Sequence, residues 1–283
     1  MTPSLVDALS EVANGDRRAA TTTVERCVAA HPSDLLAASM LDALRSTSGD
    51  VYATPDGFRA FIDNASNVTL YDATIGHLRR RHDELRPASV VDIGCGDGRV
   101  THACLAPNVS AVHLVEPSES LLGDALARTD WAVTPTPHCA DLSQFVATLD
   151  AADHFALVQS TFALHTIAPA ERSRALASLR ARTDRLIVVD FDVPAFADRS
   201  REHAEYAIER YRIGVGEYAE IPEAISGFLM PVLLGQFDPG ATRHTFEQPV
   251  ARWIDEVAAA GFDPTVEIID DYWWGPAFCL EAS

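Results

Sequence analysis

Residues from Pro87 onward alternate between short runs of β-forming residues and stretches with helical periodicity, and this alternation restricts the fold more than any other feature. The clearest predicted strands are residues 89–93, 111–115, 155–158 and 186–189. Helices are expected between and after them, at residues 99–105, 118–128, 141–149 and 169–182. Strands that alternate with helices form βαβ units, so the sequence predicts a parallel sheet covered by helices.

Three further regions complete the predicted organisation. Residues 5–86 have helical periodicity, with a helix stop and a new N-cap predicted at 31–34 and a connector at 46–57. A weak strand is predicted at 131–135. Residues 195–248 form a long insertion of mixed helical and Gly/Pro-punctuated sequence, for which we expect a lid. A helix at 249–260 and strands at 265–270 and 276–281 then resume the pattern.

The segment from Val90 to Arg99 reads VVDIGCGDGR, a strand that runs into a glycine-rich turn and opens a helix. Alternate glycines permit a tight turn and let the main chain approach a ligand, because no Cβ stands in the way. A dinucleotide fingerprint would place glycine where Arg99 stands, which weakens the interpretation as an NAD(P) site. Asp92, directly before the turn, would repel a pyrophosphate and attract an ammonium group. The segment therefore favours a cationic ligand.

This segment resembles the first motif of the class I S-adenosylmethionine-dependent methyltransferases, of the type that acts on small molecules. The resemblance covers about residues 68–192. It implies a Rossmann-like, doubly wound α/β fold with a mostly parallel seven-stranded sheet whose last strand is antiparallel. We expect an N-terminal helical cap at 1–86 and a Rossmann-like domain at 87–283 with a helical lid at about 195–248. It also implies S-adenosyl-L-methionine as methyl donor and S-adenosyl-L-homocysteine as product.

The same resemblance implies which residues bind the donor. Glu116, after the strand 111–115, would accept hydrogen bonds from both ribose hydroxyls. Asp141 would take the adenine amino group, with Leu142 beside the ring; an N-cap for the following helix is the competing interpretation, and both can hold together. Gln159 would contact the methionine part. The full predicted set is Asp92, Gly94, Cys95, Gly96, Gly98, Glu116, Pro117, Asp141, Leu142 and Gln159.

The catalytic candidates are His165 and His244, with His203 as a further candidate base. Methyl transfer from a sulfonium mainly requires alignment, so a base is optional and a structural role for each histidine is the alternative. A metal bound by His203 and His244 with Asp190 or Asp192 is an alternative role for these residues. An Asp-Phe-Asp segment after a strand is more typical of caps and loops, so no metal is predicted.

The acceptor is expected to be a small, aromatic or hydrophobic molecule, methylated on oxygen, nitrogen or carbon. The insertion at 195–248 is rich in apolar and aromatic residues. Part of this content would wall the acceptor pocket, and the remainder would be core or the contact of a homodimer. Trp273 and Trp274 are expected to pack between elements or to shape the substrate rim.

Composition restricts the partners. With 22 basic and 41 acidic residues the formal net charge is −19, which repels a polyanion, so no nucleic-acid partner is predicted. The run Arg79 to Arg81 is interpreted as a solvated helix face. No apolar stretch is long enough for a membrane span, and the N-terminus lacks a signal-peptide pattern, so a cytoplasmic location is predicted. The five cysteines are far apart and form no C-x-x-C pair, which favours reduced thiols.

Two alternatives to a methyltransferase of secondary metabolism stay open at this point. One is an NAD(P)-dependent oxidoreductase on a related fold, against which the glycine spacing argues. The other is a non-catalytic protein that binds S-adenosylmethionine to regulate an assembly, which a resemblance in fold does not exclude.

Overall fold

The computed structural model describes residues 4–46, 55–241, 243 and 245–283, and the chain divides into two compact units. The helical unit comprises residues 1–69 and 195–244. The sheet unit comprises residues 70–194 and 245–283. The predicted insertion therefore folds with the N-terminal helices rather than with the sheet.

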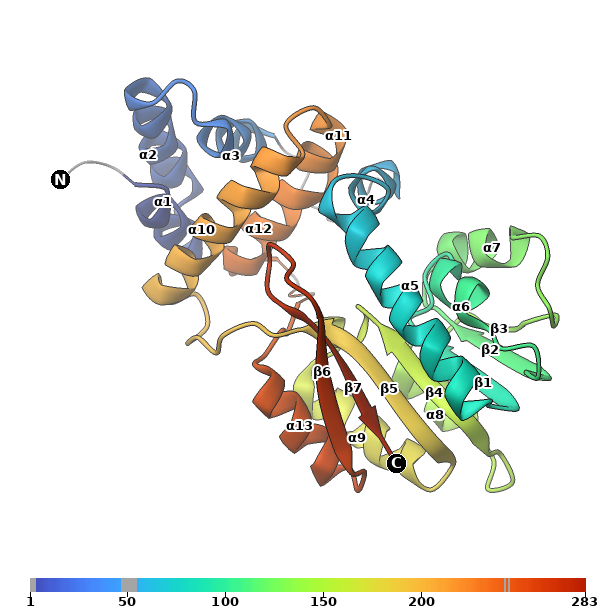
Figure 1. Cartoon of the computed structure of the whole chain (residues 1–283). Coiled ribbons are helices and arrows are strands. Elements are labelled where there is room, and N and C mark those ends of the chain that lie inside the picture. Colours follow the sequence, from blue (N-terminus) through green and yellow to red (C-terminus); the bar gives the residue numbers. More distant parts are fainter. Residues whose placement is uncertain (1–3, 47–54, 242, 244) are drawn as a thin grey trace. The chain divides into compact units, whose positions relative to one another are not determined.

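In the described residues, the sheet unit contains a seven-stranded sheet with the order β3-β2-β1-β4-β5-β7-β6 (Figure 1). The strands are β1 (Ser89–Ile93), β2 (Ala111–Val115), β3 (Thr136–His138), β4 (Phe155–Thr161), β5 (Thr183–Phe191), β6 (Pro264–Asp270) and β7 (Ala277–Ala282). β7 is antiparallel to both of its neighbours, and the remaining neighbours are parallel. This confirms the predicted fold class. The strand order reverses between β1 and β4, the point at which doubly wound sheets bind their ligands.

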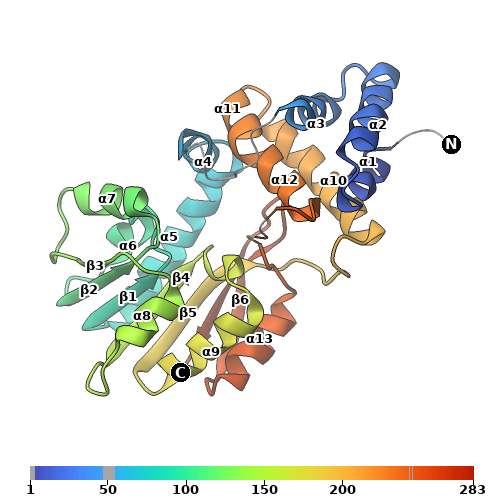
Figure 2. The same ribbon diagram turned by 180° about the vertical axis from the view of Figure 1, so that it is seen from behind.

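Helices cover both faces of this sheet (Figures 1 and 2). One face carries α5 (Ser66–Leu85) from residue 70 onward, α6 (Arg99–Cys104) and α7 (Glu119–Ala127). The other face carries α8 (Leu142–Thr148), α9 (Pro169–Arg180) and α13 (Val250–Ala259). Pro169 occupies the first turn of α9, where its missing N–H and fixed φ fit a helix start.

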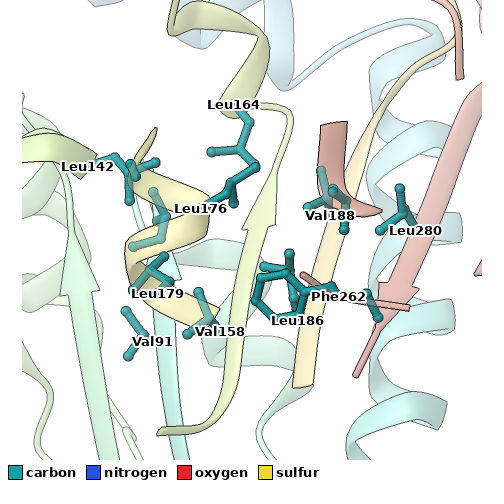
Figure 3. Close-up of a cluster of buried hydrophobic side chains, with 14 of the residues drawn as sticks. Val91, Leu142, Val158, Leu164, Leu176, Leu179, Leu186, Val188, Phe262 and Leu280 are labelled. Carbon is teal, nitrogen blue, oxygen red and sulfur yellow. The ribbon is translucent and has the colours of Figure 1, made fainter. Parts of the chain in front are cut away.

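Two hydrophobic cores lie on opposite sides of the sheet because successive strand residues point to opposite faces. Val90 packs in the core beneath α5, α6 and α7, and its neighbour Val91 packs in the core beneath α8, α9 and α13. Figure 3 shows Val91 and Val158 beside Leu176 and Leu179 of α9. Full burial of each such side chain stabilises the fold by about 1.5–3 kcal/mol before entropy costs. These cores fix the strand ends that carry the site.

The elements of the helical unit are α1 (Leu5–Ala13), α2 (Arg17–Ala30), α3 (Leu35–Arg45), α4 (Pro55–Ile62), α10 (Arg201–Glu217), α11 (Pro222–Ala224), the π-helical turn η2 (Ile225–Leu229) and α12 (Met230–Phe237). Among these helices, α1, α2, α3 and α10 begin at residues whose side chains cap them. Asp34 caps α3 by accepting the N–H of Ala37, which confirms the predicted helix start. α1 packs against α2 and α10. The predicted connector lies largely outside the described residues.

Two sequence-based expectations differ from the structure. The strand predicted at 131–135 is wrong: β3 begins at Thr136, because Trp131 donates its indole N–H to the carbonyl of Ala125, 3.1 Å away, and so holds the preceding segment against the end of α7. The helical cap was expected to span residues 1–86, whereas the N-terminal part of the helical unit ends at Thr69, since Leu78 of α5 packs in a core of the sheet unit. Within the described residues, no helix has the length and apolar character needed to cross a membrane.

Candidate active site

The glycine-rich turn leaves the carboxyl end of β1 and leads into α6. The backbone N–H groups of Gly94 and Cys95 both donate to the carbonyl of Val115, at 2.8 and 3.1 Å, so the turn is fastened to the end of β2. Gly94 and Gly96 have φ values of +68° and +54°, a region that non-glycine residues avoid. A Cβ on Gly96 would have no atom within 4 Å. The main chain at Gly96 is therefore open to close approach by a ligand.

Glu116 closes the other side of this turn. Its carboxylate accepts the backbone N–H of Gly96 at 3.0 Å and the backbone N–H of Ser118 at 2.9 Å. Burial raises the pKa of Glu116, and the two N–H donors act in the opposite direction. The exposed Pro117 follows directly. The structure thus brings together the turn and the carboxylate that the sequence predicted as partners.

Asp92 lies beneath the turn rather than in it. Its carboxylate is 2% exposed and accepts the hydroxyl hydrogen of Thr101. Burial, with a smaller contribution from the nearby Glu116, raises its pKa to about 7 against the opposing effect of the Thr101 hydrogen bond. The second oxygen, Oδ1, is buried and has no hydrogen-bond partner in the described part of the chain. A buried acceptor without a partner is costly, which makes this oxygen a candidate contact for a bound cation.

Gln159 extends this hydrogen-bonded chain inward. Its Nε2 donates to Thr101 Oγ1 at 2.8 Å, and its Oε1 is 2.8 Å from Nε2 of His82. Because Oε1 is an acceptor, His82 Nε2 carries the hydrogen, and burial lowers the pKa of this histidine. Both polar atoms of the Gln159 carboxamide take part in these two bonds. Its predicted contact with the donor stays a prediction.

Asp141 caps α8, as one of the two interpretations of the sequence expected. Its Oδ1 accepts the backbone N–H of Gln144 at 2.7 Å, and the Gln144 side chain accepts the backbone N–H of Asp141 at 3.0 Å, a capping box. Leu142 is buried in the sheet-unit core. The adenine role of Asp141 and Leu142 stays a prediction. Their segment follows β3, which lies beside the end of β2 that carries Glu116.

His165 lies in the short 3-10 turn η1 (Leu164–Thr166), just beyond β4, and is paired with Asp190 near the end of β5. The distance from His165 Nδ1 to Asp190 Oδ1 is 2.9 Å, and the backbone N–H of His165 donates to Oδ2 at 3.2 Å. Asp190 is completely buried. This geometry fixes the hydrogen on Nδ1 and directs the lone pair of the neutral ring to Nε2, the arrangement of a general base.

Charge around His165 sets its protonation. Burial alone would lower the pKa of the imidazole, but the Asp190 carboxylate, with a contribution from Glu247, raises it to about 8. The side chain is 13% exposed, so the ring is mostly buried but still partly accessible to solvent. Asp190, the partner of His165, enters the sequence analysis only as a possible metal ligand. The available signal was a carboxylate near the end of β5, the strand beside β4, after which His165 follows. This signal could be used only with knowledge of the strand order.

Aromatic rings gather beside His165 at the carboxyl ends of β4 and β5. Phe162 and Phe191 stack with centroids 4.8 Å apart and planes at 13°, and Phe191 stacks on Tyr272 at 5.4 Å. The centroid of the His165 ring is 6.1 Å from that of Phe191. Phe162 has a φ of +51°, an outlier for a bulky residue and a mark of local strain that is often found at functional sites.

The remaining candidates have other places. His244 lies outside the described residues. His203 is in the helical unit, where its ring packs between Phe196 and Phe237 and burial lowers its pKa. Asp192 caps α13 by accepting the N–H of Val250 at 2.8 Å, as expected for cap chemistry. No cluster of three or more His, Cys, Asp or Glu side chains suited to a metal occurs among the residues that the structure describes.

Comparison with known proteins agrees with this geometry. Residues 90–185 match a family model described as a methyltransferase domain. No curated protein sequence matches the chain. The matched segment begins in β1 and ends in β5, so it contains the glycine-rich turn, Glu116 and His165, and Asp190 follows it by five residues.

Solved structures of low sequence identity share the fold. The mitomycin 7-O-methyltransferase has a TM-score of 0.54 at 17% identity, over 97% of this chain and 74% of that chain. A plantazolicin methyltransferase, solved in complex with SAH, has a TM-score of 0.54 at 9% identity, over 82% and 92% of the two chains. A putative O-methyltransferase from Nostoc punctiforme has a TM-score of 0.53 at 14% identity, over 89% and 70%. The family model supports the predicted resemblance over residues 90–185, and these solved structures show that the fold is shared.

Proposed function

We propose that this chain, whose residues 90–185 belong to the methyltransferase-domain family, transfers a methyl group from S-adenosylmethionine to a small acceptor. The observation that carries the proposal is the glycine-rich turn after β1, closed by Glu116 at the end of β2. The chemistry supplied by the donor is an electrophilic methyl on a sulfonium. The residues of the chain bind the donor, orient the acceptor and remove a proton from it.

The residues at the turn fit such a donor. The open space in front of Gly96 allows main-chain contact, and each Glu116 oxygen accepts one backbone N–H, which leaves acceptor capacity for ribose hydroxyls. The unpartnered Oδ1 of Asp92 suits the cationic methionine end. Asp141 stands at the end of the neighbouring strand, where it would take the adenine amino group. These four features support a ligand with hydroxyls and a positive charge.

The acceptor is proposed to be an aromatic or hydrophobic small molecule that carries an ionisable O–H or N–H group. His165 accepts that proton at Nε2 while Asp190 holds Nδ1–H, so the imidazolium formed is stabilised by a buried carboxylate. The stacked rings of Phe162 and Phe191 offer an apolar wall beside the base. The name of the structural neighbour that methylates mitomycin at oxygen 7 supports an oxygen acceptor.

Titration calorimetry tests the donor first. S-adenosylmethionine and S-adenosylhomocysteine are expected to bind, and NAD is expected not to bind, which separates this function from the oxidoreductase alternative. Glu116→Ala should weaken binding of both at least tenfold. Glu119→Ala changes an exposed carboxylate at the start of α7 and is the matched control. Equal affinity of the Glu116→Ala variant and the wild type would reject the assignment.

The acceptor is then identified by incubating the protein with isotope-labelled donor and a panel of phenols, carboxylic acids and amines, with label transfer read by mass. Transfer is expected to a phenol or another ring-borne O–H or N–H. Binding of the donor without transfer to any member would favour the non-catalytic regulatory alternative. A cytoplasmic location, a homodimer, a role in secondary metabolism and the absence of a nucleic-acid partner remain predictions from the sequence.

A further inference from the structure

We propose that the buried ion pair of Arg172 and Glu256 positions His165 for proton transfer. The inference rests on the proposed function, in which His165 is the base. Arg172 lies on α9 and Glu256 on α13, the two helices that cover one face of the sheet next to the η1 turn. Neither residue touches the reacting groups, so both act through the turn that carries the imidazole.

The guanidinium of Arg172 is completely buried and connects that turn to α13. Its Nη1 donates to the carbonyl of Leu164 at 3.0 Å and to the carbonyl of Ile167 at 3.2 Å, the residues on either side of the η1 core. Its Nε and Nη2 donate to the carboxylate of Glu256 at 3.0 and 2.7 Å. One planar group therefore fixes both ends of the segment that contains His165.

Glu256 gathers further contacts at the same place. Its carboxylate accepts the hydroxyl of Ser173 at 2.8 Å and the side-chain amide of Gln248 at 2.8 Å. The segment that contains Gln248 also holds Phe246, whose backbone N–H donates to the carbonyl of His165 at 2.6 Å. The His165 turn is thus held by α9, by α13 through Glu256, and by the segment that precedes α13.

The physical cost of this arrangement indicates a role beyond stability. A buried ion pair loses hydration, and apolar residues of similar volume would stabilise a core as well or better. A 3-10 turn of three residues has weak internal hydrogen bonds and does not hold its own geometry. A displacement of about 1 Å in a reacting group can lower a rate roughly 100-fold. The rigid guanidinium fork supplies what the turn lacks.

The test is the Arg172→Lys variant, which keeps the positive charge but cannot span Leu164, Ile167 and Glu256 with a single ammonium. The pKa of His165 is measured by NMR titration of protein with labelled histidines. If the turn moves, the bond to Asp190 weakens and the pKa falls from about 8 toward 6.5. The kcat should fall about tenfold or more, with the Kd for S-adenosylmethionine within twofold of wild type.

Arg180→Lys is the matched control. Arg180 lies on the same helix, donates to the carbonyl of Gly261 at 2.8 Å and covers the ring of Phe262 at 4.9 Å, but it does not contact the His165 turn. This variant is expected to leave the His165 titration and kcat unchanged. The Arg172 charge lowers the pKa of His165, so withdrawal of the positive charge in Arg172→Lys would raise that pKa. A fall therefore has displacement of the turn as its cause.

A folded Arg172→Lys protein with unchanged His165 pKa and kcat would overturn the inference. If that variant does not fold, Glu256→Gln is measured in the same way, with the same expected fall. If neither Arg172→Lys nor Glu256→Gln folds while Arg180→Lys is native-like, the ion pair has a purely structural role. That result would also overturn the inference. The NMR readout needs no acceptor. A wild-type protein that transfers no methyl group therefore rejects the proposed function without deciding the positioning.

Discussion

Gly94 lies so close to Ala163 that a Cβ on the glycine would be 2.3 Å from the Cβ of the alanine. This contact joins the glycine-rich turn after β1 to the segment after β4, in which Phe162 has a positive φ and His165 follows two residues after Ala163. The donor turn and the turn that carries the proposed base therefore share a wall. A change at this wall should affect both donor binding and catalysis.

Gly94→Ala is expected to destabilise the protein by about 1–3 kcal/mol through overpacking, with an added cost from its positive φ. Donor affinity should fall at least tenfold, because the turn must move to admit the methyl group. Urea unfolding and titration calorimetry measure the two effects. Gly76→Ala is the control: Gly76 lies in α5 with no atom near its missing Cβ, so this change should stabilise by up to about 1 kcal/mol and leave binding intact. Wild-type affinity in Gly94→Ala would contradict the shared wall.

Asp190→Asn is expected to lower kcat by roughly 100-fold or more. The imidazolium loses its charged partner, and the hydrogen on His165 Nδ1 is no longer held by a carboxylate. The pKa of His165 should fall, since the carboxylate raises it in the wild type. Steady-state rates and histidine NMR measure both quantities. Asp192→Asn, two residues away, keeps an oxygen that can accept the N–H of Val250 at the start of α13, and it should leave the His165 titration unchanged. If the two variants titrate alike at His165, Asp190 does not orient the base.

The pH dependence follows from the same pair. A base must be neutral, so the rate should rise as pH increases through about 8 and level off above it. Stability changes in the opposite sense. The pKa of His165 in the folded protein lies above the unfolded value of about 6.5, so the pair stabilises fully below that value and loses its contribution as pH rises toward 8. The difference in unfolding free energy between wild type and His165→Gln should therefore shrink from pH 6 to pH 9. A rate profile that is flat from pH 6 to 9 would exclude His165 as the base.

Local signals in the sequence were enough for the strands that frame the donor turn. β1 and β2 have the predicted bounds, because each is an apolar run enclosed by turn residues. Asp34 and Asp141 cap helices as their positions before helical periodicity indicated. β3 is short and exposed and contains a proline, so its composition gave only a weak and misplaced prediction.

Pairings between distant segments were beyond such signals. The bond between His165 and Asp190 exists because β4 and β5 are neighbours, and strand order is not written in local periodicity. Gln159 binds His82, a residue 77 positions earlier on a helix that packs over the sheet, and local periodicity does not reveal this partner. Arg172 lies beside Glu256, 84 positions later in the chain, and local periodicity does not predict this pair. The chemistry of these residues depends on partners that only the tertiary structure supplies.

Asp92→Asn separates the two effects of a buried carboxylate. Burial raises the pKa of Asp92 to about 7, so between about pH 4 and pH 7 the folded protein holds a proton that the unfolded chain releases. Wild-type stability therefore falls as pH rises through this window. Asparagine keeps an acceptor for Thr101 and does not ionise, so the variant should gain stability relative to wild type between pH 5 and pH 8.

Donor binding should change in the opposite direction. At pH 8 the ionised carboxylate attracts a cationic ligand and the neutral amide does not, so the affinity of Asp92→Asn for S-adenosylmethionine should fall about tenfold or more. Urea unfolding at pH 5 and pH 8, with calorimetry at pH 8, measures both. Glu119→Gln removes an exposed carboxylate of α7 and should change neither quantity. An Asp92→Asn variant that is more stable at pH 8 yet binds the donor as tightly as wild type would contradict this role. The cost of burying the carboxylate would then be removed without loss of binding, so the unpartnered oxygen of Asp92 would contact no ligand.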